Sequence, residues 1–104
     1  MTAVKEDLAK EVERLLETYR VPRHSVGYIV AREVIIIMYD SPDMKLNDVI
    51  KAAAEGLGFT YRSAYYSVTA CVKDAHVPGY PDKLTPKKFF RLCANQISRC
   101  HMED

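Results

Sequence analysis

The sequence is poor in the residues that build disulfide frameworks and zinc sites. It contains three cysteines, Cys71, Cys93 and Cys100, an odd number without a CxxC pair. The pair Cys100-His101 lacks further ligands at the spacing that zinc sites use. The first residues are charged where a secretory signal peptide would be apolar. We therefore expect a cytoplasmic protein with reduced thiols and no metal, in which Cys71 and Cys93 fill apolar core positions.

Long apolar runs and enzyme signatures are also missing. The longest unbroken apolar run is Val34–Tyr39, whereas a membrane-spanning helix needs roughly 20 residues. No glycine-rich phosphate loop, HExxH motif or paired-carboxylate arrangement occurs in the sequence. These absences argue against a membrane protein and against an enzyme, so we expect no catalytic residue, no cofactor and no small-molecule substrate.

Neither sign of charge dominates the whole chain, but the charges are unevenly placed. The formal net charge is +1. Residues 1–40 carry six Lys/Arg and seven Asp/Glu, whereas residues 56–101 carry seven Lys/Arg and two Asp/Glu. We therefore expect an anionic partner to approach the C-terminal half.

Apolar residues recur at helical spacing in several segments. Pro22 is expected to end the first helix, and Thr85-Pro86 places a capping residue before a proline that suits the first helical position. A chain of 104 residues has the size of one domain. The sequence therefore predicts a single all-α domain over residues 1–104, with helices over about 5–19, 26–39, 46–57, 60–76 and 86–100, and a loop over 77–85.

The segment 26–39 carries mixed signals. Val, Ile and Tyr favour strands, and its apolar run follows neither period cleanly. Its length exceeds that of a usual strand, Ser25 is suited to cap a helix here, and Arg32–Glu33 is its only polar stripe. We interpret it as a central helix with its apolar residues mostly buried, namely Val34, Ile35, Ile37 and Met38.

The stretch AEGLGFTYRSAYYSV, residues 54–68, joins the third and fourth helices through a turn of about three residues. Ala54 is small at the helix crossing, Gly58 suits the left-handed position that closes a helix, and Thr60 suits the cap of the next one, with Phe59 at the corner. This spacing is typical of a helix-turn-helix, in which the second helix enters the major groove of DNA. It fits a plain αα-hairpin equally well. The tyrosines either contact a partner or fold back onto neighbouring helices.

The stretch VERLLETYRVPRHSVGYIVAREVIIIMY, residues 12–39, is more specific. It resembles the opening of the C-terminal DNA-binding domain of the sporulation response regulator family, stage 0 sporulation protein A. In that family an amphipathic helix leads through a Val-Pro-x-His corner and a Gly-Tyr pair into a helix that carries Arg-Glu and closes on Tyr. The similarity continues through about Ala52–His76 and is one of pattern only over Pro86–Arg99. The matching positions of the opening are Val21, Pro22, His24, Gly27, Tyr28, Arg32, Glu33 and Tyr39.

The resemblance implies an all-α fold of about five helices, with a helix-turn-helix in the third and fourth, and a transcription regulator that binds double-stranded DNA sequence-specifically. A homodimer on DNA is left open. The fourth helix is expected to read bases with Arg62, Ser63, Tyr65, Tyr66 and Thr69. Phosphate contacts are expected from Thr60, Tyr61, Lys73, Lys45, Lys51, Lys87 and Lys88. Lys87 and Lys88, with Arg91 and Arg99, can equally form a solvated helix face.

The chain also differs from the family pattern. The family's recognition helix is rich in Arg and Glu. This chain keeps Arg62 but has other residues at the outward positions, namely Ser63, Tyr65, Tyr66, Thr69 and Ala70, so the family's base preference is not carried over. The connection over Val77–Thr85 is shorter than in the family. Because the first helix begins close to Met1, we expect no phosphoacceptor receiver domain in this chain, which is then either a stand-alone protein or a fragment. The alternative interpretation is a protein-interaction module of the same fold, with Tyr61, Tyr65 and Tyr66 as its contact surface.

Overall fold

The computed structural model describes residues 2–23, 25–79 and 84–102, and within them the chain forms five α-helices and no strand. The helices are α1 (Thr2–Thr18), α2 (Val26–Asp40), α3 (Leu46–Leu57), α4 (Tyr61–Asp74) and α5 (Pro86–Met102). The predicted all-α fold is confirmed, including the helix over residues 26–39. The Cα radius of gyration of 12.7 Å fits a compact body, since about 13 Å is typical of a domain of 100 residues. None of the described helices is long and apolar enough to cross a membrane.

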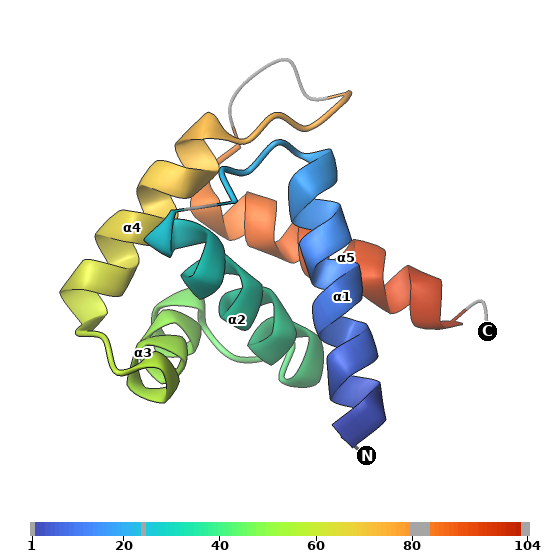
Figure 1. Cartoon of the computed structure of the whole chain (residues 1–104), viewed down its shortest axis with the longest axis horizontal. Helices are drawn as coiled ribbons and strands as arrows, with labels where there is room; N and C mark the ends of the chain where they lie inside the picture. Colours follow the sequence, from blue (N-terminus) through green and yellow to red (C-terminus); the bar gives the residue numbers. More distant parts are fainter. Residues whose placement is uncertain (1, 24, 80–83, 103–104) are drawn as a thin grey trace.

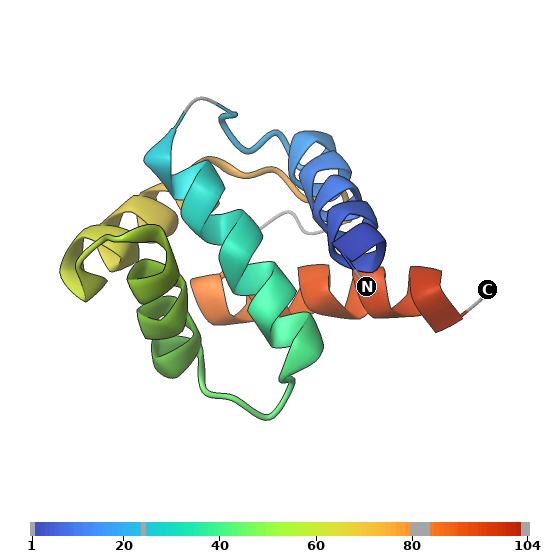
Figure 2. The ribbon, with the colours of Figure 1, turned by 60° about the horizontal axis from the view of Figure 1, so that its bottom comes forward.

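α2 lies at the centre of the fold and packs against each of the other four helices. Figure 1 shows α1 on one side of α2 and the α3–α4 pair on the other, and Figure 2 shows α5 passing beneath it. Val34, Ile35 and Met38 are buried as predicted. Ile37 is covered less completely than these three residues but packs against the core, so the prediction that it is mostly buried is confirmed. It lies at the edge of the buried stripe of α2, where the neighbouring helices cover it incompletely.

Gly27 sets how closely α2 and α4 approach each other. A Cβ atom at this position would lie 2.3 Å from the backbone oxygen of Ser67 and 2.6 Å from the Cβ atom of Cys71. Real Cβ atoms do not approach a backbone oxygen so closely, and this oxygen cannot move without shifting α4. The first turn of α2 therefore crosses α4 at a distance that only glycine allows.

The predicted capping residues form the expected hydrogen bonds. The Ser25 hydroxyl oxygen accepts from the backbone N–H of Tyr28 at 3.2 Å and fixes the start of α2. Thr60 does the same for Ser63 at the start of α4, at 3.2 Å. The Thr85 hydroxyl oxygen accepts from the N–H of Lys88 at 3.3 Å, one turn into α5. Local sequence thus determines where these helices begin.

The end of α1 differs from the prediction. The helix stops at Thr18, and Arg20 adopts a left-handed conformation with φ of 59°. The N–H of Arg20 donates to the Glu17 oxygen and the N–H of Val21 to the Leu16 oxygen, both at 3.0 Å. This is the Schellman arrangement, so the left-handed residue ends α1 and Pro22 only follows it.

α4 ends at Asp74, two residues before the predicted end. The next residue, Ala75, is extended, and the backbone N–H of His76 donates to the Tyr19 oxygen at 2.7 Å. This hydrogen bond joins the chain after α4 to the corner after α1. A tertiary contact therefore takes over the backbone donor that another helical turn would have used.

Two matching positions of the sporulation-regulator resemblance have structural roles in this chain. Arg32 Nη1 lies 2.9 Å from Glu13 Oε1, so a half-buried ion pair joins α2 to α1. Tyr28 is buried in the core. Burial raises the pKa of its hydroxyl, and the nearby carboxylates of Glu13 and Glu17 raise it further.

Cys71 and Cys93 are free thiols buried in the core, as predicted from their positions on the apolar faces of helices. Burial raises the pKa of Cys93 to about 12. Burial also raises the pKa of Cys71, whose Sγ lies 3.8 Å from Ser25 Oγ. A thiol with a raised pKa is a poor nucleophile at neutral pH. The side chain of Cys100 and the whole of His24 lie outside the described part of the structure.

Candidate functional site

α3 and α4 are joined by the three residues Gly58, Phe59 and Thr60. Gly58 has φ of 78°, and its N–H donates to the Glu55 oxygen at 3.3 Å. The N–H of Phe59 donates to the Ala54 oxygen at 2.8 Å, and the Phe59 ring packs half-buried against the core. This second Schellman arrangement, followed by the Thr60 cap, fixes the direction in which α4 leaves α3. The local roles predicted for this turn are confirmed.

One face of α4 holds the helix in the molecule. Ala64, Val68, Cys71 and Val72 are buried against the rest of the fold. The opposite face is exposed in the described part of the structure, and Figure 1 shows α4 at the edge of the molecule. The exposed residues of α4 are Tyr61, Arg62, Ser63, Tyr65, Tyr66, Ala70, Lys73 and Asp74.

The three tyrosines of this face do not fold back under neighbouring helices. The exposed fractions are 39% for Tyr61, 38% for Tyr65 and 64% for Tyr66. Instead the rings pack on one another: the Tyr61 and Tyr65 centroids lie 5.9 Å apart, and those of Tyr65 and Tyr66 lie 6.0 Å apart in an edge-to-face arrangement. Exposed tyrosines that support one another in this way form a rigid surface with apolar faces and polar tips.

Two hydroxyl groups predicted to touch DNA have partners within the protein. Thr60 Oγ1 accepts from the Ser63 amide and keeps its own proton available to a ligand. The half-buried Thr69 differs, because its hydroxyl donates to the backbone oxygen of Tyr65 at 2.7 Å. Thr69 therefore has its methyl group and an acceptor lone pair left for a ligand, but no donor.

The predicted cations lie on α4 and on two helices that pack against it. Lys73 is exposed in the last turn of α4. Lys45 occupies the position before α3 without capping it, and Lys51 is exposed on α3. Lys87 and Lys88 are exposed near the start of α5, the end of that helix nearest α4 in both views (Figures 1 and 2). The described residues thus place cations beside α4 on two of the helices that pack against it, α3 and α5.

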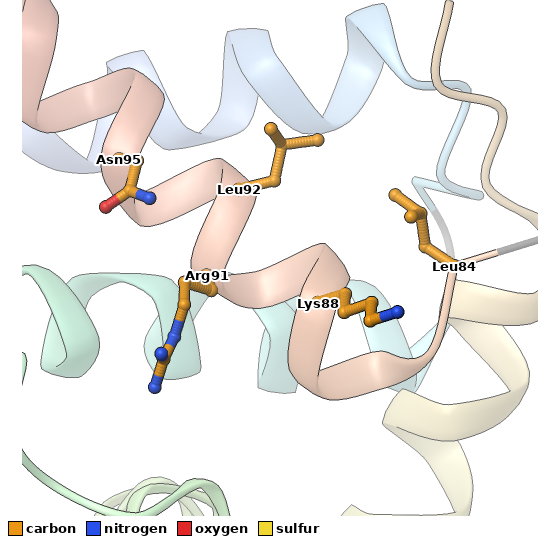
Figure 3. A pocket seen from close by; sticks show the side chains of 5 residues that line it. All are labelled: Leu84, Lys88, Arg91, Leu92 and Asn95. Carbon is orange, nitrogen blue, oxygen red and sulfur yellow. The ribbon is translucent and has the colours of Figure 1, made fainter. Parts of the chain in front are cut away.

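A surface hollow on α5 was not predicted. It has a volume of about 260 Å³ and is lined by Leu84, Lys88, Arg91, Leu92 and Asn95. Figure 3 shows Arg91 pointing to the other side of α5 from Leu92. A second hollow of about 480 Å³ shares Arg91 and Asn95 and extends to the loop after α2. Long solvent-exposed side chains form much of these walls, so neither hollow holds convergent polar groups in the way a small-molecule site does.

Comparison with known proteins gives no family for this chain, because no protein-family model and no curated protein matches it. Within the described residues no group of three or more His, Cys, Asp or Glu side chains is arranged to hold a metal ion.

Proposed function

We propose that this chain is a cytoplasmic transcription regulator that binds double-stranded DNA, with α3 and α4 acting as a helix-turn-helix and α4 entering the major groove. The observation that carries the proposal is the uncovered face of α4, which begins with Arg62 and continues through exposed tyrosines. A helix held by one face and exposed on the other for four turns is what groove insertion requires.

The arrangement of side chains on α4 supports this proposal. Arg62 lies in the first turn, where a recognition helix meets base edges, and no described acidic side chain pairs with it. Its guanidinium is therefore available to donate two hydrogen bonds to one guanine. Ser63, Tyr65, Tyr66 and Thr69 complete the set that we assign to the groove.

Phosphate contacts follow from the position of the remaining groups. Thr60 retains a free hydroxyl proton at the positive end of the α4 dipole, where phosphate oxygens are favoured. Tyr61 and Lys73 mark the two ends of α4. We expect four lysines to contact phosphates beyond the groove, because α3 and α5 pack against α4. They are Lys45, directly before α3, Lys51 on α3, and Lys87 and Lys88 on α5.

The resemblance to the sporulation response regulator family adds to this interpretation. The glycine of the Gly-Tyr pair, Gly27, allows the close crossing of α2 with α4, and the arginine of the Arg-Glu pair, Arg32, ties α2 to α1. Residues of the shared pattern therefore help to position the helix that we assign to DNA. The proposed function is regulation of transcription by such an effector domain.

Binding to duplex DNA at several salt concentrations tests the proposal. Folded protein is titrated with a pool of random duplexes between about 50 and 200 mM salt, and the logarithm of the binding constant should fall linearly with the logarithm of the salt concentration, by about 0.9 per phosphate contacted. Arg14→Ala serves as a matched control, because Arg14 is exposed on α1, across α2 from α4 (Figure 1). Helix content by circular dichroism establishes that each variant is folded.

A second function is favoured by the same tyrosines. Tyr66 is exposed over 64% of its surface, and exposed aromatic residues are enriched at protein interfaces. On this alternative the chain is a protein-interaction module that has kept the fold and lost DNA binding. If the folded wild type shows no salt-dependent DNA binding even at low ionic strength, the DNA proposal fails and the alternative replaces it.

A further inference from the structure

The exposed face of α4 lacks several of the side-chain types that form hydrogen bonds with base edges. Residues 60–73 contain no Asn, Gln, Asp or Glu. Asn and Gln are the side chains that pair with adenine, and Asp and Glu accept from cytosine. Apart from the cations Arg62 and Lys73, this helix can offer the bases hydroxyl groups, aromatic rings and methyl groups.

The middle of the face is mainly apolar. Arg62, Tyr66, Thr69 and Lys73 follow one another at steps of three or four residues, and Ala70 lies beside Thr69, four residues after Tyr66 and three before Lys73. These five residues therefore form one stripe along α4. Tyr66 and Ala70 are exposed, and the Thr69 hydroxyl proton is held by the Tyr65 oxygen at 2.7 Å. The centre of the stripe thus presents a ring and two methyl groups between a cation at each end.

The length of the stripe matches a groove. Lys73 lies eleven positions after Arg62, which corresponds to roughly 16 Å along a helix axis. The major groove is about 12 Å wide. When Arg62 meets base edges, Tyr66, Thr69 and Ala70 pass over the adjacent bases, and Lys73 lies near the phosphates at the rim. The excess of positive charge over residues 56–101 complements the same partner.

We infer that Tyr66, Thr69 and Ala70 read the 5-methyl groups of thymines in the major groove. This inference rests on the proposed DNA binding and adds the chemistry that the site recognises. Thymine is the base that presents an apolar group in the major groove, and side-chain methyl groups and aromatic rings are the partners that fit it. The bound duplexes therefore carry thymines beside the position that Arg62 contacts.

The test removes the methyl groups without changing base pairing. Duplexes are first selected from a random pool by binding to the wild-type protein, and a selected duplex is then synthesised with deoxyuridine in place of thymidine. Each contacted methyl group that is removed should weaken binding about three- to fivefold. A second duplex, with deoxyuridine only outside the selected sequence, controls for altered DNA shape.

Two variants at one position separate the methyl group from the hydroxyl group. Thr69→Val keeps a methyl group and removes the hydroxyl, and it should keep the preference for thymidine over deoxyuridine. Thr69→Ser keeps the hydroxyl bonded to the helix and removes the methyl group, so it should reduce that preference for at least one thymine. Thr69→Ser and the deoxyuridine duplex are then combined in a double-mutant cycle. If removal of a thymine methyl group weakens binding less in the variant than in the wild type, Thr69 contacts that methyl group.

The outcomes distinguish this inference from the proposed function. Salt-dependent binding with equal affinity for thymidine and deoxyuridine duplexes would overturn the reading of methyl groups and leave the DNA-binding proposal standing. Loss of the preference in Thr69→Val but not in Thr69→Ser would overturn it as well, because the hydroxyl would then be the reading group. The absence of any DNA binding by folded protein would reject both proposals.

Discussion

Gly27 illustrates how one residue controls the position of a whole helix. Its Cα sits against the backbone of α4, and an added Cβ would meet the Ser67 oxygen at 2.3 Å. A methyl group can be accommodated only if α2 and α4 move apart, which also disturbs the core residues between them. The closeness of this crossing depends on the tertiary arrangement, so the sequence reveals the glycine without revealing what it touches.

We predict that Gly27→Ala destabilises the protein by about 1–3 kcal/mol or more, the cost of forcing extra volume into a packed interior. Gly56→Ala is the matched control, because it is also helical and a Cβ there would meet nothing within 4 Å. The free energy of unfolding of this control should rise by about 0.5–1 kcal/mol, because alanine has a better helix propensity than glycine. Urea unfolding of the two variants measures both changes, and equal stabilities would contradict the close approach.

Arg20 stores strain at the end of α1. It holds φ of 59° although it has a Cβ atom, and this conformation costs roughly 1–2 kcal/mol for an L-residue. We predict that Arg20→Gly stabilises the protein, by about 0.5–1 kcal/mol after the greater flexibility of glycine in the unfolded chain is included. Arg14→Gly, in the interior of the same helix, should instead cost about 1 kcal/mol. A loss of stability in both variants would argue against a left-handed Arg20.

Cys93 gives the protein a defined response to alkaline pH. Burial raises its pKa to about 12 in the folded state, whereas an exposed thiol has a pKa of about 8.5. Below pH 8 the thiol is neutral in both states and pH has no effect through this group. Between about pH 9 and 11 the unfolded state loses its proton and the folded state keeps it, so stability falls as pH rises, by about 1.4 kcal/mol per pH unit.

The measurement compares the wild type with Cys93→Ala by chemical denaturation at several pH values. The variant loses core volume and should be less stable at pH 7. Its stability should nevertheless fall less steeply between pH 9 and 11, and the difference in slope isolates Cys93 from the other titrating groups. Parallel slopes would show that Cys93 is not protected by folding.

At the scale of the elements, three helix beginnings and the end of α3 at Gly58 follow from local rules, whereas the ends of α1 and α4 do not. Ser25, Thr60 and Thr85 cap helices where the sequence predicts them, because a cap needs only its own following turn. The ends of α1 and α4 depend on a strained arginine and on a hydrogen bond to a distant corner. Neither contact is visible in a hydrophobic pattern.

The candidate site was predictable to a similar extent. The turn residues Gly58 and Thr60 were assigned correctly because each requirement is local. Whether the tyrosines fold back or remain exposed depends on how α3 and α5 pack beside α4, and the sequence left both outcomes open. The orientation of the Thr69 hydroxyl, which restricts what Thr69 can offer a ligand, likewise appears only in the structure.

The central helix α2 provides the test at this scale. Ile35 is fully buried, whereas Ile29, six residues earlier in the same helix, is exposed over 39% of its surface. We predict that Ile35→Ala costs about 2–5 kcal/mol through lost burial and an unfilled cavity. Ile29→Ala should change stability by much less, with the same helix propensity effect in both variants. Similar losses at both positions would contradict the orientation of α2.

At the scale of the whole molecule, the core draws on all five helices, whereas the proposed binding face uses side chains that α4 leaves exposed. The acidic N-terminal part contributes α1 and the ion pair that fixes α2, whereas the basic part contributes α4 and α5. This separation allows the charges of α4 to change without loss of the fold, because Arg62 and Lys73 are exposed. The two cations can therefore be removed one at a time.

We predict that the two removals affect DNA binding in different ways. Arg62→Ala should reduce the difference in binding free energy between a selected duplex and random duplexes by about 1–3 kcal/mol, because a bidentate contact to guanine discriminates between bases. Lys73→Ala should weaken binding to all duplexes alike and reduce the salt slope by about one, because a phosphate contact carries no sequence information. Lys10→Ala on α1, equally exposed, should change neither quantity. If Arg62→Ala weakens selected and random duplexes equally, Arg62 contacts the backbone, and α4 does not lie in the groove in the orientation that we propose.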